Sequence, residues 1–251
     1  MNILKTYTVA TERPGTFLVY WTNSPVRPSG VIKVRVLAKT EDVQIVAELA
    51  AMQHLLEEKR AIGTNLVGNP NTRLTISQGA IRKLQRNQSD KAHLAPYANF
   101  LTTRFAGCQL SVEKDTRWFD GVDLNSAEEL LVSEPRREMI KVTGLGEVSV
   151  TQHVLNRFSD RFLPETKTDN VGRLAWKKLL ETAADPMVRE VVRAGIWNAV
   201  KYARQNKHEG RYFLNSRRNL ILVVTDNPGE GKRLVTAYPA NRQYFQLAQA
   251  A

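Results

Sequence analysis

The first third of the chain carries strand-like and helix-like hydrophobic patterns in one particular order. Residues 5–11, 16–22 and 31–38 are rich in aromatic and β-branched side chains, and the last of these segments alternates strictly between apolar and polar positions. Prolines and glycines separate the three segments, which predicts an antiparallel meander of strands. Apolar residues at helical spacing follow over residues 41–61, and residues 73–77 again resemble a buried strand. This order predicts a mixed α+β unit.

The same unit is predicted to end with shorter elements. Helices are expected over residues 78–85 and 93–105, and a strand over residues 108–113. Residues 123–131 (DLNSAEELL) begin with an Asn-Ser capping signal, which predicts a final helix. Pro135 and two arginines follow, and we place the domain boundary near them.

The second half has a different pattern, with helices first and strands afterwards, so we predict two α+β domains, over residues 1–135 and 141–251. Three helices are predicted over residues 149–162, 174–184 and 187–206. Three strands, joined by turn-forming residues, are predicted over residues 210–215, 219–226 and 233–239. The second domain should therefore combine helices with an antiparallel sheet of three to four strands, and the tail from Gln243 is expected to be frayed or helical.

The composition is that of an ordinary globular protein. Of the 251 residues, 42% are hydrophobic and 24% are charged, which excludes collagen-like and low-complexity disordered classes. The longest apolar run, residues 220–224, is far shorter than the roughly 20 residues that span a bilayer, and we expect no secretory signal. The single cysteine, Cys108, cannot form an internal disulfide, and the four histidines show no zinc-ligand spacing. We therefore expect a cytoplasmic protein without a metal, a cofactor or a membrane partner.

The net charge of +11 is the first indication of a partner. Residues 1–140 contain 18 basic and 15 acidic residues, whereas residues 141–251 contain 18 basic and 10 acidic ones. A basic surplus attracts polyanions, because each neutralised phosphate releases condensed counterions. We therefore predict a nucleic-acid partner, RNA rather than DNA, although basic proteins also bind other anionic partners.

The order of elements in the first half resembles the ribonuclease H fold, which has three antiparallel strands, a helix, a parallel strand, helices and a last strand. Residues 47–58 (AELAAMQHLLEE) look like the first helix of that family, in which Glu48 matches an acidic residue near the start. Residues 75–84 (TISQGAIRKL) look like its fourth strand and the following turn, but Ile76 occupies the position of the family's aspartate. The aspartate of the first strand falls at Val9 or Ala10 and is also absent.

This loss argues against metal-dependent cleavage by the first half. Two-metal phosphodiester cleavage needs several carboxylates that converge on two Mg²⁺ ions about 4 Å apart. Glu48 provides one carboxylate, and even with Glu128 or Glu129 from the predicted last helix there are too few carboxylates to hold two Mg²⁺ ions. We expect no paired Mg²⁺ site in this half. Its Glu48 is expected to be a solvated helix residue, and the domain is interpreted as a binding or docking module.

A more specific motif in the second half is His153-x₃-Arg157-x₃-Arg161. On a helix this spacing places one imidazole and two guanidinium groups in a single stripe. A metal-free ribonuclease needs groups that transfer protons at the ribose 2′-hydroxyl and the leaving 5′-oxygen, together with fixed positive charge at the phosphate. Histidine titrates near neutral pH and arginine binds phosphate in a bidentate manner. The alternative interpretation is an ordinary basic helix face.

The motif and the following sheet resemble the barnase/EndoU/colicin/RelE-like ribonuclease superfamily. Its phage- and toxin-associated members often begin with a helical H-x₃-R-x₃-R and end with a strand reading V-x-V-T-x-Y, and the last strand here reads LVTAY over residues 234–238. The resemblance covers about residues 145–242 and departs from the simplest pattern by the long helical insertion predicted before residue 206. Carried over by position, it implicates as catalytic residues His153, Arg157, Arg161, Thr236 and Tyr238.

Other polar residues are candidates for contact with nucleic acid. Tyr212 is a candidate for stacking on a base, although a half-buried sheet aromatic is the alternative. The arginines of the following turn are candidates for phosphate contacts, although they also suit a solvated hairpin. The complete set of predicted nucleic-acid-binding residues is Lys201, Arg204, Tyr212, Asn215, Arg217 and Arg218. Trp176 and Trp197 are expected in the core, His208 is interpreted as structural, and His54 and His93 have no recognisable partner pattern.

Three functions remain open on the sequence alone. The first is a metal-independent endoribonuclease in the second half, with the first half positioning RNA or a host target. The second is a non-catalytic protein that binds a nucleic acid or a ribonucleoprotein with both domains. The third is a phage-encoded modulator that acts on a host protein, and an antitoxin is a further candidate partner. Both resemblances are at the level of the fold, which does not by itself confer a function.

Overall fold

The computed structural model describes residues 2–24, 29–63, 71–164, 171–193, 210–229, 231–240 and 245–247. The chain divides into two compact units, which are named unit 1 (residues 1–136) and unit 2 (residues 137–251). Both units combine helices with a mixed sheet, so the predicted α+β class is confirmed. The division falls beside Pro135, where the sequence turns from strand-like residues to proline and charged residues.

The sheet of unit 1 has the strand order β5-β4-β1-β2-β3-β6. Strands β1 (Asn2–Ala10), β2 (Thr16–Ser24) and β3 (Ser29–Val36) form the antiparallel meander that the sequence predicts. Strand β4 (Thr72–Ile76) runs parallel to β1, with Thr75 paired with Lys5, and β5 (Gln109–Val112) runs parallel to β4. The buried strand predicted over residues 73–77 is therefore confirmed as β4, which lies beside the first strand.

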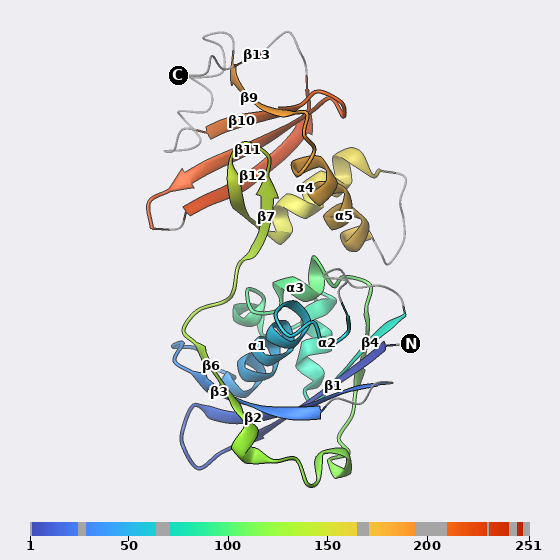
Figure 1. Cartoon of the computed structure of the whole chain (residues 1–251), viewed down its shortest axis with the longest axis vertical. Helices are drawn as coiled ribbons and strands as arrows, with labels where there is room; N and C mark the ends of the chain where they lie inside the picture. The colour runs from blue at the N-terminus through green and yellow to red at the C-terminus, as the bar shows by residue number, and fades with distance from the viewer. Residues whose placement is uncertain are drawn as a thin grey trace. The chain divides into compact units, whose positions relative to one another are not determined.

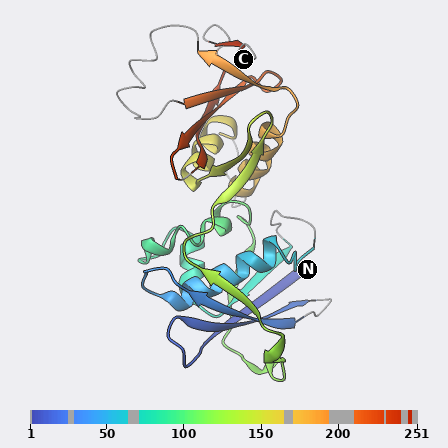
Figure 2. The ribbon, with the colours of Figure 1, turned by 60° about the vertical axis from the view of Figure 1, so that its left-hand side comes forward.

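The helices of unit 1 cover one face of this sheet (Figures 1 and 2). Helix α1 (Val43–Glu57) is buried along most of its length, and α2 (Gly79–Gln85) contributes Ile81 and Leu84 to the same core. The single helix predicted over residues 93–105 is instead two short pieces, η1 (Ala92–Leu94) and α3 (Asn99–Thr102). The segment between β5 and β6 crosses the other face and contains the short helical turns η2 (Arg117–Phe119) and η3 (Leu124–Ser126).

The prediction of a helix over residues 123–131 is wrong. The cap in the structure is Asp123 and not the predicted Asn-Ser pair: its carboxylate accepts a hydrogen bond from the Asn125 amide at 2.9 Å, and the helical turn that it caps is only three residues long. The chain then extends as β6 (Glu128–Val132), which pairs in parallel with β3. Leu130 and Val132 pack on the core as alternate residues of this strand. The burial of every second residue and the pairing with β3 therefore decide the conformation of this segment, and the local capping signal does not.

Unit 2 is built on a seven-stranded sheet of order β13-β9-β10-β11-β12-β8-β7. It begins with a hairpin that was not predicted from the sequence, β7 (Glu138–Val142) and β8 (Gly146–Val150), whose turn contains Gly144 at φ +77°. Helices α4 (Gln152–Phe162) and α5 (Val171–Ala183) follow, close to the predicted ranges. The predicted meander is confirmed in β10 (Gly210–Asn215), β11 (Leu220–Asn227) and β12 (Gly231–Pro239).

The third helix predicted for this unit is wrong in its first part. The segment after Asp185 forms strand β9 (Val188–Arg193), which pairs with β10. Valines 188 and 191 lie at helical spacing in the sequence, but β-branched residues also favour strands, and here both are buried in the sheet. The remainder of that prediction, residues 194–206, lies outside the described residues. Part of the predicted frayed or helical tail is a short strand, β13 (Phe245–Leu247).

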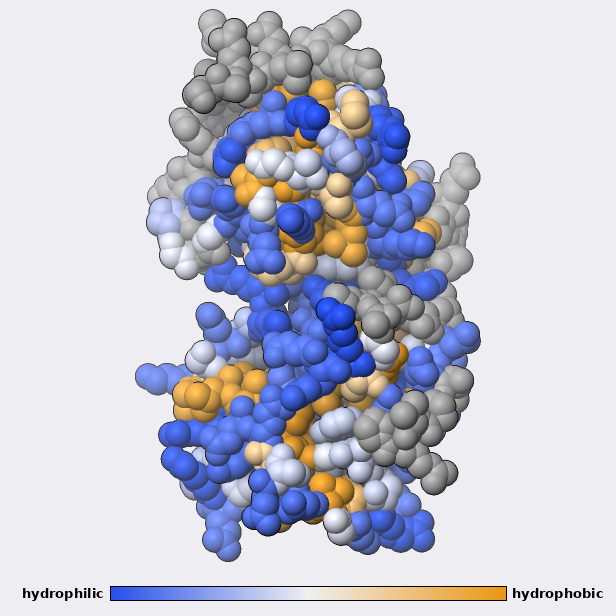
Figure 3. Space-filling model, in the orientation of Figure 1, coloured by the Kyte–Doolittle hydropathy of each residue, from blue (hydrophilic) through white to orange (hydrophobic). Residues whose placement is uncertain are grey.

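The surface is mainly hydrophilic on the face of the molecule seen in Figure 3, with hydrophobic residues in separate patches. Trp176 of α5 is 1% exposed, which confirms its predicted place in the core. Trp197 lies outside the described residues. Among the described helices, none is long and apolar enough to cross a membrane.

Candidate functional site

Helix α4 carries the predicted His-x₃-Arg-x₃-Arg stripe on its exposed side. Val154, Leu155 and Phe158 are at most 2% exposed, so they fix which side of the helix faces the core of unit 2. His153, Arg157 and Arg161 lie on the other side and are exposed, as spacing by four residues requires. At 1.5 Å per residue, His153 and Arg161 are about 12 Å apart along the helix axis. The stripe is therefore an elongated surface and not a compact cluster.

Arg161 connects this stripe to the last strand of the sequence motif. Its guanidinium donates a hydrogen bond from Nη1 to Thr236 Oγ at 3.0 Å and a second one to the backbone carbonyl of Ala237. Both acceptors belong to β12, which pairs with its neighbour β8 only at Arg233 and Ser149. The structure thus brings together two of the predicted catalytic residues, which are separated by 75 positions in the chain.

Helices α4 and α5 pack against each other on one face of the unit 2 sheet (Figure 1). Asn215 of β10 donates a hydrogen bond to the Thr182 carbonyl of α5, so the face that includes Asn215 is covered by this helix. Phe213 lies two residues away on the same face and is buried. Phe213 pairs with Leu222 on β11, and Leu222 pairs with Ala237 on β12. Paired residues share a face, so the Ala237 side chain also lies on the face that the helix covers.

The cross-strand pairs assign Tyr238 to the opposite face, whereas the Thr236 hydroxyl remains within hydrogen-bond distance of Arg161 on α4. Thr236 pairs with Val223, and Tyr238 pairs with Ile221, on either side of the inward-facing Ala237. Tyr212, a predicted base-stacking residue, pairs with the same Val223 and packs with Tyr238 against an apolar cluster on that face. Both tyrosines are half-buried, as the alternative interpretation of Tyr212 expects. The sheet therefore lies between Tyr238 and the helix that carries His153.

Asn215 is not a surface residue, contrary to its prediction as a contact to nucleic acid. Its side chain is 0% exposed, its Nδ2 donates to the Thr182 carbonyl at 3.0 Å, and its Oδ1 accepts from the Arg218 amide at 2.9 Å. These bonds fix the β10–β11 turn against α5. A buried side chain with these partners cannot reach a nucleic acid, so its role is structural.

Asn215→Ala should lower the free energy of unfolding of unit 2 by about 2–3 kcal/mol, because it leaves a buried carbonyl and a backbone amide without their partners. Urea titration followed by hydrogen exchange of the β10 and α5 amides measures this change in unit 2. Arg217→Ala, at an exposed position in the same turn, is the matched control and should change the unfolding energy by less than about 0.5 kcal/mol. Equal effects of the two substitutions would contradict the structural role.

The other predicted contacts to nucleic acid are distributed unevenly. Arg217 and Arg218 are exposed in the turn after β10, and Arg218 forms an ion pair with Glu181 at 3.2 Å. Lys201 and Arg204 lie outside the described residues. Of the six predicted residues, the turn arginines are thus the exposed ones among those described.

Glu48 of unit 1 is fully buried, which contradicts its expected solvation. Its Oε1 accepts hydrogen bonds from the Ser77 amide at 2.7 Å and from Thr6 Oγ at 3.0 Å, and its Oε2 accepts one from Ser77 Oγ at 2.6 Å. Burial raises the pKa of this carboxyl, and the hydrogen bonds from Ser77 and Thr6 and the charge of Lys114 oppose the rise. The carboxyl group therefore joins α1 to β1 and to the end of β4. Three donors already occupy its oxygens.

One group of side chains among the described residues has the spacing of metal ligands. Glu41, Asp42 and His93 bring potential ligand atoms within 4.8 Å of one another. The Lys91 ammonium group, however, lies 2.8 Å from both carboxylate oxygens of Asp42, and Asp42 also contacts His93 at 3.4 Å. A cation of the protein thus already binds this carboxylate.

His54 has partners that its sequence context does not indicate. This buried side chain lies 2.9 Å from Glu58 on the same helix and 3.2 Å from Glu128 on β6. The contact with Glu58 follows the i, i+4 spacing, but Glu128 is 74 residues away and comes close only because β6 is a strand. His54 therefore belongs to the packing of unit 1.

Comparison with known proteins provides no relative from which a role can be transferred. No protein-family model matches this sequence, and no curated protein matches it either. The function must therefore be inferred from the side chains that the fold exposes.

Proposed function

We propose that unit 2 binds RNA through the exposed stripe of α4. The observation that carries this proposal is that His153 and Arg157 are exposed beside Arg161 and form no hydrogen bond or ion pair with any residue that the structure describes. An unpaired guanidinium group on a rigid helix is well suited to a phosphate oxygen. The basic surplus of residues 141–251 supplies the long-range attraction that brings a polyanion to this surface.

RNA cleavage is the second candidate function, and the contact between Arg161 and Thr236 favours it. This hydrogen bond joins the two segments on which the resemblance to the barnase/EndoU/colicin/RelE-like superfamily depends. The separation of His153 from Tyr238 by the sheet favours binding without cleavage, because 2′-hydroxyl attack needs a proton acceptor and a proton donor at the same phosphate. Binding is therefore the function that the geometry supports best.

We further propose that unit 1 has a ribonuclease H-like fold without nuclease activity. The strand order β5-β4-β1-β2-β3, with three antiparallel strands followed by parallel ones, supports the resemblance in the fold. The hydroxyl groups of Thr6 and Ser77 donate hydrogen bonds to the Glu48 carboxylate, which supports a unit in which this carboxylate does not bind a metal ion. Such a unit is suited to docking, with a nucleic acid, a ribonucleoprotein or a host protein as its partner.

Arg157→Gln should weaken the binding of single-stranded RNA about three- to tenfold and lower the slope of log affinity against log salt by about 0.7, the contribution of one phosphate contact. Fluorescence anisotropy in EDTA at several salt concentrations measures both quantities. The matched control is Arg82→Gln on α2 of unit 1, which removes an equally exposed guanidinium group. Loss of affinity in both variants would indicate attraction by net charge alone and would contradict a site on α4.

A further inference from the structure

The face of the unit 1 sheet that the helices leave uncovered carries aromatic and basic side chains. Leu4, Val19 and Val34 are fully buried in the core beneath the helices, so the alternate residues of each strand point to the other face. This outer face includes Tyr7 and Tyr20, which are directly paired across β1 and β2. None of these outer positions is used by the stripe of α4, which belongs to unit 2.

The segment that crosses the outer face adds two more aromatic rings. Phe119 stacks on Tyr20, with ring centroids 4.2 Å apart and an interplanar angle of 11°, and it also contacts Tyr7 at 5.4 Å. Trp118 meets the edge of Phe119 at 5.1 Å. All four rings are half-buried, so each keeps part of its surface in contact with solvent. Phe119 contacts each of the other three rings and therefore holds the cluster together.

Basic side chains lie next to this aromatic cluster on β3. Lys33 and Arg35 alternate with the buried Ile32 and Val34, so both project from the outer face. Lys33 forms an ion pair with Glu129 at 2.7 Å, and the pKa of Glu129 is lowered by Lys33 first and also by Arg13 and Arg35. The charges of three cations thus act on one carboxylate, of which only Lys33 is in direct contact with it, so positive charge is in excess around Glu129.

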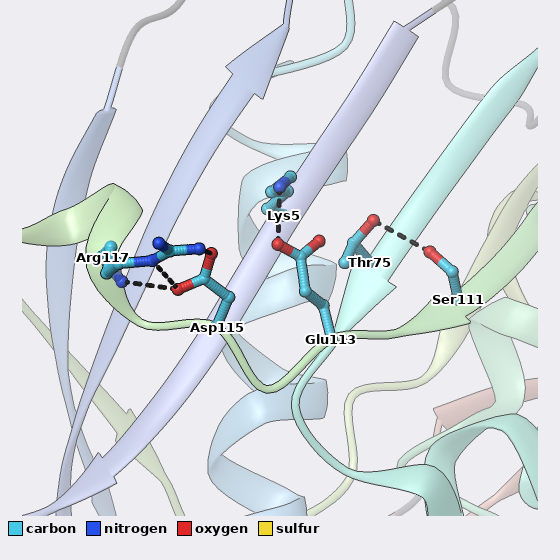
Figure 4. Close-up of polar contacts among 6 residues, drawn as sticks. All are labelled: Lys5, Thr75, Ser111, Glu113, Asp115 and Arg117. Atoms are coloured by element: carbon cyan, nitrogen blue, oxygen red, sulfur yellow. Dashed lines mark hydrogen bonds and ion pairs between the residues drawn. The ribbon is translucent and has the colours of Figure 1, made fainter.

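The charges at the other end of the same face are paired. Lys5 contacts Glu113 at 2.9 Å, and Arg117 contacts Asp115 at 2.9 Å (Figure 4). Hydrogen bonds from Arg117 lower the pKa of Asp115 to about 2, so this carboxylate stays ionised and balances its partner. The outer face therefore has a charge-balanced end near β1 and β5, an aromatic centre, and a positive end on β3.

We propose that this outer aromatic face, formed by Tyr7, Tyr20, Trp118, Phe119, Lys33 and Arg35, binds single-stranded nucleic acid. Accessible rings on an open sheet stack with unpaired bases, and adjacent cations hold the backbone phosphates. The Tyr20 and Lys33 positions are diagonal neighbours on adjacent strands, about 7–8 Å apart, so a base on the ring keeps its phosphate within reach of the ammonium group. A duplex hides its base faces and cannot use the rings.

The test uses the full chain in EDTA and a fluorescein-labelled single-stranded oligonucleotide of about 15 nucleotides, within the length range of single-strand binding sites. Trp118→Ala should raise the dissociation constant at least about fivefold, because it removes a stacking ring. Lys33→Gln/Arg35→Gln should raise it as well and lower the salt slope by about 1.4, the contribution of two phosphate contacts. The second variant changes only exposed side chains, so it tests the surface even if Trp118→Ala unfolds unit 1.

The matched control is Arg82→Gln/Lys83→Gln, which removes two exposed positive charges from α2, on the helix-covered side of the same sheet. It should bind the oligonucleotide as the unmodified protein does. Equal weakening by both double variants, equal affinity for a duplex of the same length, or no binding of either probe would overturn the proposal.

These variants distinguish binding at the outer aromatic face from binding at the stripe of α4. If Arg157→Gln weakens binding and the outer-face variants do not, the stripe is supported and the outer aromatic face is not a site. If only the outer-face variants weaken binding, the reverse holds.

Discussion

Glu48→Ala should lower the free energy of unfolding of unit 1 by about 3–5 kcal/mol, which places it among the largest effects of a single substitution. The change leaves the Ser77 amide, the Ser77 hydroxyl and the Thr6 hydroxyl buried without their acceptor, and it opens a cavity beneath α1. Urea titration by circular dichroism, combined with hydrogen exchange of the α1 amides, assigns the loss to unit 1. Glu41→Ala, at an exposed glutamate just before the same helix, is the control and should have little effect.

Glu48→Gln separates the hydrogen bonds of this residue from its charge. Because burial raises the pKa of Glu48, the folded state binds a proton more tightly than the unfolded state does. This contribution to stability is fully present below the ordinary carboxyl pKa of 4.5 and is lost as the pH rises through the raised value. The glutamine variant has no such titration and keeps one oxygen acceptor for Ser77. Its unfolding energy relative to the unmodified protein should therefore increase with pH above 4.5, and a constant difference would show that Glu48 does not titrate in this way.

The strands of the fold could be predicted where the sequence pattern of a strand is complete within the segment itself. Strands β1, β2 and β3, and later β10 to β12, have alternating or β-branched segments between clear turn residues, and these signals are local. Strand β6 has five residues after a true helical cap, so its identity depends on β3, almost a hundred residues earlier. The valines of β9 fit either period, and only the pairing with β10 decides between helix and strand.

The candidate site could likewise be predicted only where its sequence signals are local. Spacing by four residues on a helix is a local property, so the exposed stripe of α4 follows from the sequence. The face on which Thr236 lies depends on an irregularity in the pairing of β12, where Val223 pairs with Thr236 and Val224 with Leu234, which leaves Val235 as an extra residue. One additional residue reverses which side chains face the helices. Sequence motifs contain no information about such a shift, and for this reason Tyr238 could not be assigned to a face in advance.

His153→Ala has the largest expected effect on activity and distinguishes the two functions considered for unit 2. If the unit cleaves RNA by 2′-hydroxyl attack, removal of the imidazole should reduce the cleavage rate about 10²- to 10⁴-fold, the usual contribution of general acid–base catalysis. Affinity for RNA should fall much less, because it depends on distributed charge. The measurement is cleavage of total RNA in EDTA, with detection of cyclic-phosphate ends, and His93→Ala, at an exposed histidine of unit 1, is the matched control.

If unit 2 only binds RNA, the unmodified protein should produce no cyclic-phosphate ends, and His153→Ala should change affinity by less than Arg157→Gln does. The reason is chemical, since a guanidinium group is always charged and binds phosphate through two parallel hydrogen bonds, a geometry that an imidazole does not offer. The geometry favours this result. His153 is about 12 Å along the helix axis from Arg161, whose guanidinium already donates to Thr236, and Tyr238 lies on the other face of the sheet. Cleavage that depends on His153 would therefore require a proton-transfer partner other than Tyr238, on the same side of the sheet as α4.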